Sequence, residues 1–115
     1  MISQGDVFWL NLGDPKGHGL AYRHPHVVIQ GDSYNRGGIH TYVVCGITSN
    51  LRIARFPGTV RLRKGEANLS KDSVVNITQI YTADENELTE KIGSLGSECV
   101  QEILKGVSLL LNFEN

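Results

Sequence analysis

The chain has 115 residues, of which 40% are hydrophobic and 20% charged, with a formal net charge of −1. This size and composition fit one globular domain spanning 1–115, with a single core. The longest apolar run, 107–111, is interrupted by Ser108 and is far too short to span a bilayer. The first residues have neither a basic start nor an apolar signal core, so we expect a cytoplasmic protein that makes no membrane contact.

The two cysteines, Cys45 and Cys99, stand far apart, and neither a CxxC nor an HExxH pattern occurs. We therefore expect buried thiols in a reducing compartment rather than a disulfide or a metal pair. No metal and no other cofactor is expected.

The charges are distributed unevenly along the chain. Residues 1–64 carry eight Lys and Arg against three Asp and Glu, whereas residues 65–115 carry three against nine. A polyanion could dock on the first half, although an uneven solvated surface explains the same pattern. This asymmetry alone does not indicate nucleic-acid binding.

Five segments have the β-branched and aromatic content, or the alternation, that is typical of strands. They are 6–12, 25–30, 39–47, 57–63 and 73–82, and the last is expected to bend near 76–78. Glycine, proline and short polar residues predict a turn at 31–38, an irregular basic connection at 48–56 and a polar loop at 64–72.

The hydrophobic period changes after these strands. Leu88 and Ile92 are four residues apart in a charged segment, which predicts a short helix at 84–92. From residue 97 the spacing of apolar residues predicts an amphipathic helix with Ser97 as its N-cap and a close contact at Gly106. Five or more short strands followed by such a helix predict a mainly β fold, a small SH3-like barrel of five to seven strands.

The loop between the first two strands is unusually rich in groups that act on phosphates. Lys16, His18, Arg23 and His24 fall within nine positions. Imidazoles transfer protons near neutral pH, and a guanidinium holds phosphate in a forked grip.

Six blocks of the sequence resemble the successive blocks of the MazF/PemK/Kid toxin family and cover nearly the whole chain. They are GDVFWLNLGDP–KGH, HPHVVIQGDSYN, VVCGITSN, FPGTV, SVVNITQIYT and KIGSL. The resemblance implies an SH3-like barrel, a homodimer and a metal-independent, sequence-specific endoribonuclease of a type II toxin–antitoxin module. It also implies that single-stranded RNA binds at the dimer groove and that the C-terminal segment of a cognate antitoxin competes there.

Metal-free cleavage of RNA uses the substrate 2′-OH as nucleophile, with one group accepting its proton and another protonating the leaving 5′-oxygen. Cationic or hydrogen-bonding groups stabilise the phosphorane, and the product is a 2′,3′-cyclic phosphate. We assign these catalytic roles to His18, Arg23, His24 and Thr48. RNA-binding roles are assigned to Lys16, Ser49, Asn50, Arg52, Arg55 and Gln79. Arg52 and Arg55 are expected to matter more than Arg63 and Lys64.

The chain departs from the family pattern at several positions. His24 stands where an arginine is usual, so either Arg23 reaches the phosphate or His24 supplies a titratable group and Arg23 points elsewhere. Asn76 and Thr78 replace an arginine and an aspartate, and Tyr81 replaces another arginine. Two alternatives therefore stay open: a non-catalytic RNA- or partner-binding barrel, and a gyrase poison of the CcdB kind. We expect His26 and His40 to be strand residues without a catalytic role.

Overall fold

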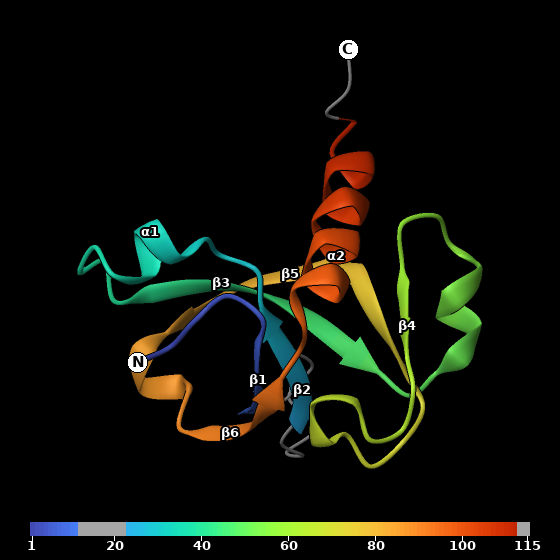
Figure 1. The fold of residues 1–115 in the computed structure, drawn as a ribbon, viewed down its shortest axis with the longest axis horizontal. Coiled ribbons are helices and arrows are strands. Elements are labelled where there is room, and N and C mark those ends of the chain that lie inside the picture. Colours follow the sequence, from blue (N-terminus) through green and yellow to red (C-terminus); the bar gives the residue numbers. More distant parts are fainter. Residues whose placement is uncertain (12–22, 113–115) are drawn as a thin grey trace, which may run out of the picture.

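The structure, a computed structural model, describes residues 1–11 and 23–112. Its elements in chain order are β1 (Asp6–Asn11), β2 (Arg23–Val28), α1 (Asp32–Asn35), β3 (Thr41–Thr48), η1 (Leu51–Arg55), β4 (Val60–Leu62), η2 (Glu66–Asn68), β5 (Ser73–Asp84), η3 (Glu85–Glu87), β6 (Glu90–Ser94) and α2 (Ser97–Leu110), where η marks a 3-10 helix. The six strands form one antiparallel sheet in the order β4-β5-β3-β2-β1-β6. The sheet curls into a half-barrel, and α2 stands on it (Figure 1). The predicted mainly β fold, with a small barrel and a C-terminal amphipathic helix, is confirmed.

Alternation along the strands divides the core between two faces of the sheet. Val7, Val27 and Cys45 are fully buried on the face that α2 covers, which we call the helix face. Phe8 and Val28 are buried on the other side, which we call the opposite face. The side of the sheet on which a residue lies therefore decides which neighbours it can reach.

The helix α2 is held to the sheet by Val100 and Ile103, which are buried in the helix-face core. The close contact predicted at Gly106 is confirmed, because a Cβ built there would lie 2.9 Å from the carbonyl carbon of Gly58. Among residues 1–11 and 23–112, none of the helices has the length and apolar character needed to cross a bilayer.

Two predictions about helices are wrong. The N-cap of α2 is Gly96, without a side-chain cap, so Ser97 is already inside the helix. The segment 84–92 is the end of β5, a 3-10 turn closed by a capping box, and the start of β6, which pairs with β1. Leu88 packs on the opposite face and Ile92 on the helix face, so their four-residue spacing does not mark one side of a helix.

The predicted bend near 76–78 is confirmed as a bulge in β5. Cys45 pairs with Ile80 whereas the next residue, Gly46, pairs with Asn76, so 77–79 are extra residues on β5. The Oδ1 of Asn76 accepts hydrogen bonds from the backbone N–H of Thr78 at 3.1 Å and from its hydroxyl at 2.6 Å. The bulge aims Thr78 and the following residue outward.

Candidate functional site

The predicted site residues gather where β2 begins and β3 ends. Lys16 and His18 lie outside the described residues. Neighbouring positions on β2 point to opposite sides of the sheet, although Arg23 and His24, at the start of the strand, both line one cleft. The other assigned residues lie on β3, on the segment that follows it and on the bulge of β5.

His24 and Thr48 share the opposite face. His26 pairs with Gly46 across β2 and β3. This antiparallel register, continued by two residues, brings His24 to the position opposite Thr48, with both side chains on one side of the sheet. An imidazole and a hydroxyl therefore come from adjacent strands, although they are far apart in the sequence.

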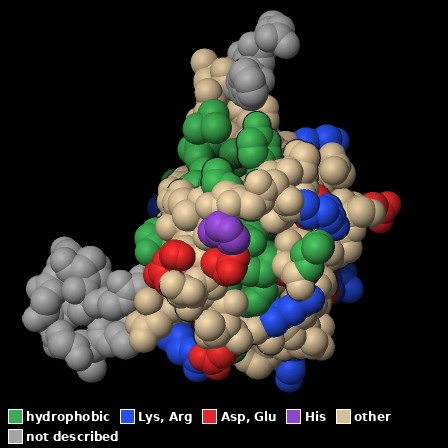
Figure 2. All heavy atoms as spheres, turned by 90° about the vertical axis from the view of Figure 1, so that its left-hand side faces the viewer, with side chains coloured by type: hydrophobic (Ala, Val, Ile, Leu, Met, Phe, Trp, Pro, Cys, Tyr) green, Lys and Arg blue, Asp and Glu red, His purple; other side chains and the backbone are tan. Residues whose placement is uncertain are grey.

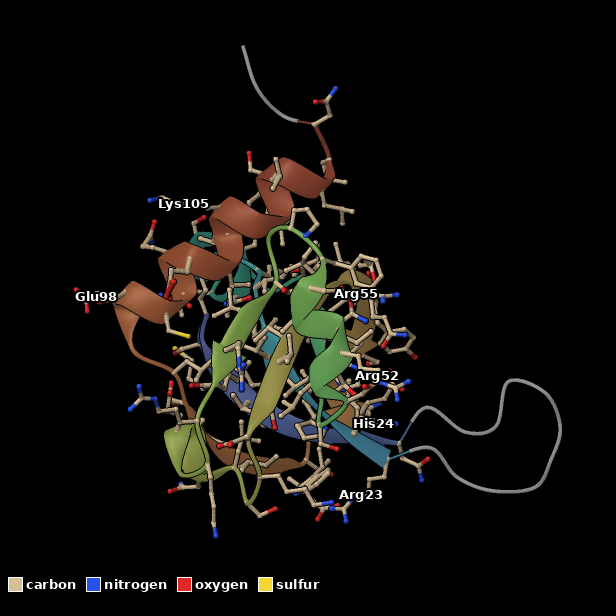
Figure 3. All side chains as sticks on the ribbon, turned by 90° about the vertical axis from the view of Figure 1, so that its right-hand side faces the viewer. Arg23, His24, Arg52, Arg55, Glu98 and Lys105 are labelled. Carbon is tan, nitrogen blue, oxygen red and sulfur yellow. The ribbon has the colours of Figure 1, made fainter. Side chains whose placement is uncertain are left out.

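Hydrogen bonds after β3 orient the hydroxyl and the basic segment. The Oγ1 of Thr48 accepts the backbone N–H of Asn50 at 3.1 Å, which leaves its own proton available for a phosphate oxygen. The side chain of Asn50 accepts the N–H of Arg52 at 3.2 Å and so caps η1. Arg52 and Arg55 lie on η1, and Figure 3 shows them with His24 along one side of the molecule.

A buried histidine, for which the sequence predicted no catalytic role, supports this arrangement. His26 is 3% exposed, and its Nδ1 lies 3.0 Å from the carbonyl oxygen of His24. Because a carbonyl only accepts, Nδ1 carries the proton of the neutral ring. Burial lowers the pKa of His26 below its ordinary 6.5, partly offset by this hydrogen bond. His26 is thus a neutral donor that fixes the backbone at His24.

Gln79 comes from the bulge to the same face. A Cβ built on Gly46 would lie 3.2 Å from the Oε1 of Gln79 and 3.7 Å from the Nε2 of His26. A side chain at Gly46 would press on the exposed Gln79, which lies close to β3 here. Gln79 therefore lies on the same face as His24 and Thr48, as its predicted RNA-binding role requires.

Arg23 lies on the helix face, in a different setting. Its Nη2 is 2.6 Å from the Oε2 of Glu90, and its Cζ is 4.7 Å from the ring centroid of Trp9. Side-chain alternation puts His24 on the side of Thr48 and Arg23 on the other side of the sheet, and the catalytic roles of both stay predictions. Ser49 also lies on the side of Arg23, where both line a cleft.

Three features that shape the site were not predicted from the sequence. They are the donor role of His26, the ion pair of Arg23 with Glu90, and the lysine at position 71, which lines the cleft with Arg23. The described part of the chain holds no group of three or more His, Cys, Asp or Glu side chains placed to bind a metal.

Fold and site together define a small curled-sheet protein that presents an imidazole, a hydroxyl and two arginines beside one another, a surface suited to a phosphate-bearing polymer. The family model of the PemK-like, MazF-like toxin of type II toxin–antitoxin systems matches residues 3–111. The chain belongs to this family.

Relatives and a solved structure agree with this family assignment. The endoribonuclease MazF6 of Mycobacterium tuberculosis is 37% identical over 112 residues, which cover 97% of this chain and 98% of that protein. The endoribonuclease MazF of Staphylococcus saprophyticus is 32% identical, covering 96% of this chain and 92% of its own. A mycobacterial endoribonuclease solved in complex with its cognate antitoxin superposes with a TM-score of 0.81 at 19% identity, covering 100% of this chain and 99% of that chain. This last likeness shows the fold.

Proposed function

We propose that the protein is an endoribonuclease that cleaves single-stranded mRNA without a metal ion, as the toxin of a type II toxin–antitoxin module in the cytoplasm. The observation that carries the proposal is the register of β2 with β3, in which His26 pairs with Gly46; side-chain alternation from that pair puts His24 and Thr48 on one side of the sheet, and η1 with its arginines follows β3. The relatives at 37% and 32% identity are endoribonucleases, which supports it.

In the proposed reaction the 2′-oxygen of the substrate attacks the adjacent phosphorus while the bond from phosphorus to the 5′-oxygen breaks. A base accepts the 2′-proton and an acid gives a proton to the leaving oxygen, so the products are a 2′,3′-cyclic phosphate and a 5′-hydroxyl. His24 supplies one of these groups, and His18 is the candidate for the other. The hydroxyl of Thr48 donates to a phosphate oxygen as negative charge develops.

The flanking residues bind the polymer in this proposal. Arg52 and Arg55 neutralise phosphates of the RNA backbone, while Gln79 contacts the substrate from the bulge. Lys16, in the first loop, adds a cation, and Ser49 and Asn50 offer polar groups next to Thr48. Arg23 engages RNA from the other side of β2.

The proposed partners are an antitoxin and a second copy of the chain. Large apolar side chains are exposed near the end of α2, where Leu109 is 58% and Leu111 63% exposed, and on β5, where Ile80 is 40% exposed. Figure 2 shows hydrophobic side chains at the surface where α2 stands on the sheet. Such exposed apolar residues favour contact with another protein.

A non-catalytic RNA-binding barrel is the second candidate. Asn76 and Thr78 bond to each other and bring no charge to the bulge, which favours binding over proton transfer. The gyrase-poison alternative is tested by a DNA supercoiling assay with purified gyrase, run beside the RNA cleavage.

The test is incubation of the purified protein with a long single-stranded RNA in excess EDTA. We expect cleavage, products whose 5′-hydroxyl is labelled by polynucleotide kinase, and a loss of about 100-fold or more in His24→Ala. His40→Ala is the matched control, because His40 lies next to the other end of β3 from Thr48. Binding of RNA without cleavage would favour the non-catalytic barrel. Inhibition of gyrase without RNA cleavage would favour the gyrase poison.

A further inference from the structure

A cleft of about 360 Å³ opens at the start of β2, where both Arg23 and the proposed catalytic residue His24 line it. Its volume lies at the lower end of the range for small-molecule pockets. It is lined by Trp9, Arg23, His24, Pro25, Ile47, Ser49, Asn68, Leu69, Ser70, Lys71, Ser73 and Ile92. Two cations and several hydroxyl or amide groups are among these, and none of the described lining residues is a carboxylate.

The wall of the cleft formed by η2 and β6 is fixed by packing. The side-chain amide of Asn68 donates to the carbonyl of Ile92 at 2.9 Å, which joins η2 to β6. A Cβ built on Gly93 would lie 2.5 Å from the oxygen of Ala67, so the two backbones are in direct contact. Leu69 is 6% exposed and anchors the following segment in the core. The cleft is therefore formed before any ligand binds.

Glu90 forms an ion pair with Arg23, one of the two cations that line the cleft. Its Oε2 lies 2.6 Å from Arg23, whose guanidinium covers the ring of Trp9 at 4.7 Å. Trp9 and Glu90 are paired across β1 and β6, so the carboxylate reaches Arg23 from the neighbouring strand. A carboxylate held on a guanidinium occupies the position that a phosphate takes in the forked contact.

We propose that this cleft is a second nucleotide subsite for single-stranded RNA, and that Glu90 holds Arg23 as an internal substitute for phosphate until the RNA displaces it. The inference rests on the proposed function. Ser49 lines the cleft and directly follows Thr48, so a strand bound at Thr48 can pass over the end of β3 into it. There a base stacks on Trp9 or Arg23, and Lys71 faces a phosphate.

Trp9 is the single tryptophan of the chain, so its fluorescence reports on the cleft directly. The probe is a random-sequence RNA of about 16 nucleotides, the upper end of the length range of single-strand binding sites, with 2′-O-methyl riboses. It lacks the attacking hydroxyl and is not cleaved. Fluorescein at its 5′ end gives total binding by anisotropy. We expect the two signals to change together as protein and RNA are mixed.

Charge variants test whether Glu90 competes with RNA for Arg23. Glu90→Gln is expected to tighten binding about two- to fivefold, because the exposed ion pair that competes with RNA is weak. Glu98→Gln changes the net charge equally and lies on α2, away from Arg23 (Figure 3), so it is expected to leave affinity within error. Lys71→Gln should weaken binding and reduce the Trp9 signal, whereas Lys105→Gln on α2 should do neither.

The outcomes separate the subsite from the proposed function. Anisotropy that reports binding while Trp9 fluorescence stays constant would overturn the subsite and leave the nuclease intact. Equal affinities for Glu90→Gln and Glu98→Gln would overturn the proposed competition between Glu90 and RNA for Arg23. An acidic decapeptide that changes the Trp9 signal when RNA does not would assign the cleft to a protein segment instead. Absence of both RNA binding and cleavage would overturn the proposed function and the subsite together.

Discussion

The Nδ1 of buried His26 donates to the carbonyl oxygen of His24, at a distance of 3.0 Å. This contact makes one histidine a positioning residue for the other. A strand residue for which no catalytic role was expected thus holds the backbone from which the proposed proton-transfer group projects.

The protein should lose stability in mild acid because of His26. Burial lowers the pKa of His26 below 6.5, so below about pH 6.5 the unfolded chain binds a proton that the folded chain does not. We expect the free energy of unfolding, measured by urea denaturation, to fall as the solution is taken from neutral pH to about two pH units below it. The fall should be smaller in His26→Gln.

His40→Gln is the contrasting variant. The carboxylate of Glu85 raises the pKa of His40, so the folded chain holds this proton above the ordinary pKa of 6.5. Its small stabilising effect is complete below pH 6.5 and is lost as pH rises through the raised pKa. An acid-side slope that is unchanged in His26→Gln would contradict the assignment to His26.

Thr48→Val should lower the cleavage rate about 100-fold, because it removes a donor aimed at the developing charge. Thr48→Ser keeps the hydroxyl and should stay within a few-fold of the wild type. The measurement is single-turnover cleavage of the long RNA. Equal rates for Val and Ser would show that the hydroxyl takes no part.

Arg52 and Arg55 should dominate the salt dependence of RNA binding. Replacing both with Gln should reduce the slope of log affinity against log salt by about two, because each phosphate contact contributes about one. Arg63→Gln with Lys64→Gln removes the same charge beyond β4 and should leave the slope unchanged. A larger effect from this second pair would place the RNA path on the other side of the sheet.

Gly106→Ala should destabilise the fold by about 1 to 3 kcal/mol, because the added methyl overlaps the backbone of Gly58. Gly31→Ala is the control, since nothing lies within 4 Å of a Cβ built at that position. Urea denaturation at neutral pH measures both. Stability equal to wild type in Gly106→Ala would mean that α2 shifts without cost.

Cys45 should resist alkylation in the folded protein. Burial raises the pKa of its thiol to about 12, and its Sγ donates to the carbonyl of Asn76 at 3.3 Å. Iodoacetamide in mildly alkaline buffer, followed by mass spectrometry, should modify Cys99 first, since Cys99 is half-buried. Both should react in urea, and earlier modification of Cys45 without urea would contradict the buried setting.

The parts of the fold that depend on local pattern could be predicted from the sequence. Strand content, the apolar stripe of α2 and the bend at 76–78 follow from neighbouring residues. The helix predicted at 84–92 is wrong because Leu88 and Ile92 pack on two different faces of the sheet, and pairing of β6 with β1 outweighs local helical spacing. Roles for Lys16 and His18 stay predictions.

By itself the sequence determined the family, through blocks whose order runs the length of the chain, and the residue types available for chemistry. Only the tertiary structure decided which of them lie on the same side of the sheet. Side chains alternate with a period of two, so the pairing of His26 with Gly46 implies that His24 and Thr48 share one side of the sheet and that Arg23 points to the other. There it meets Glu90, 67 positions away, a pairing that depends on the closure of the sheet and not on any local signal.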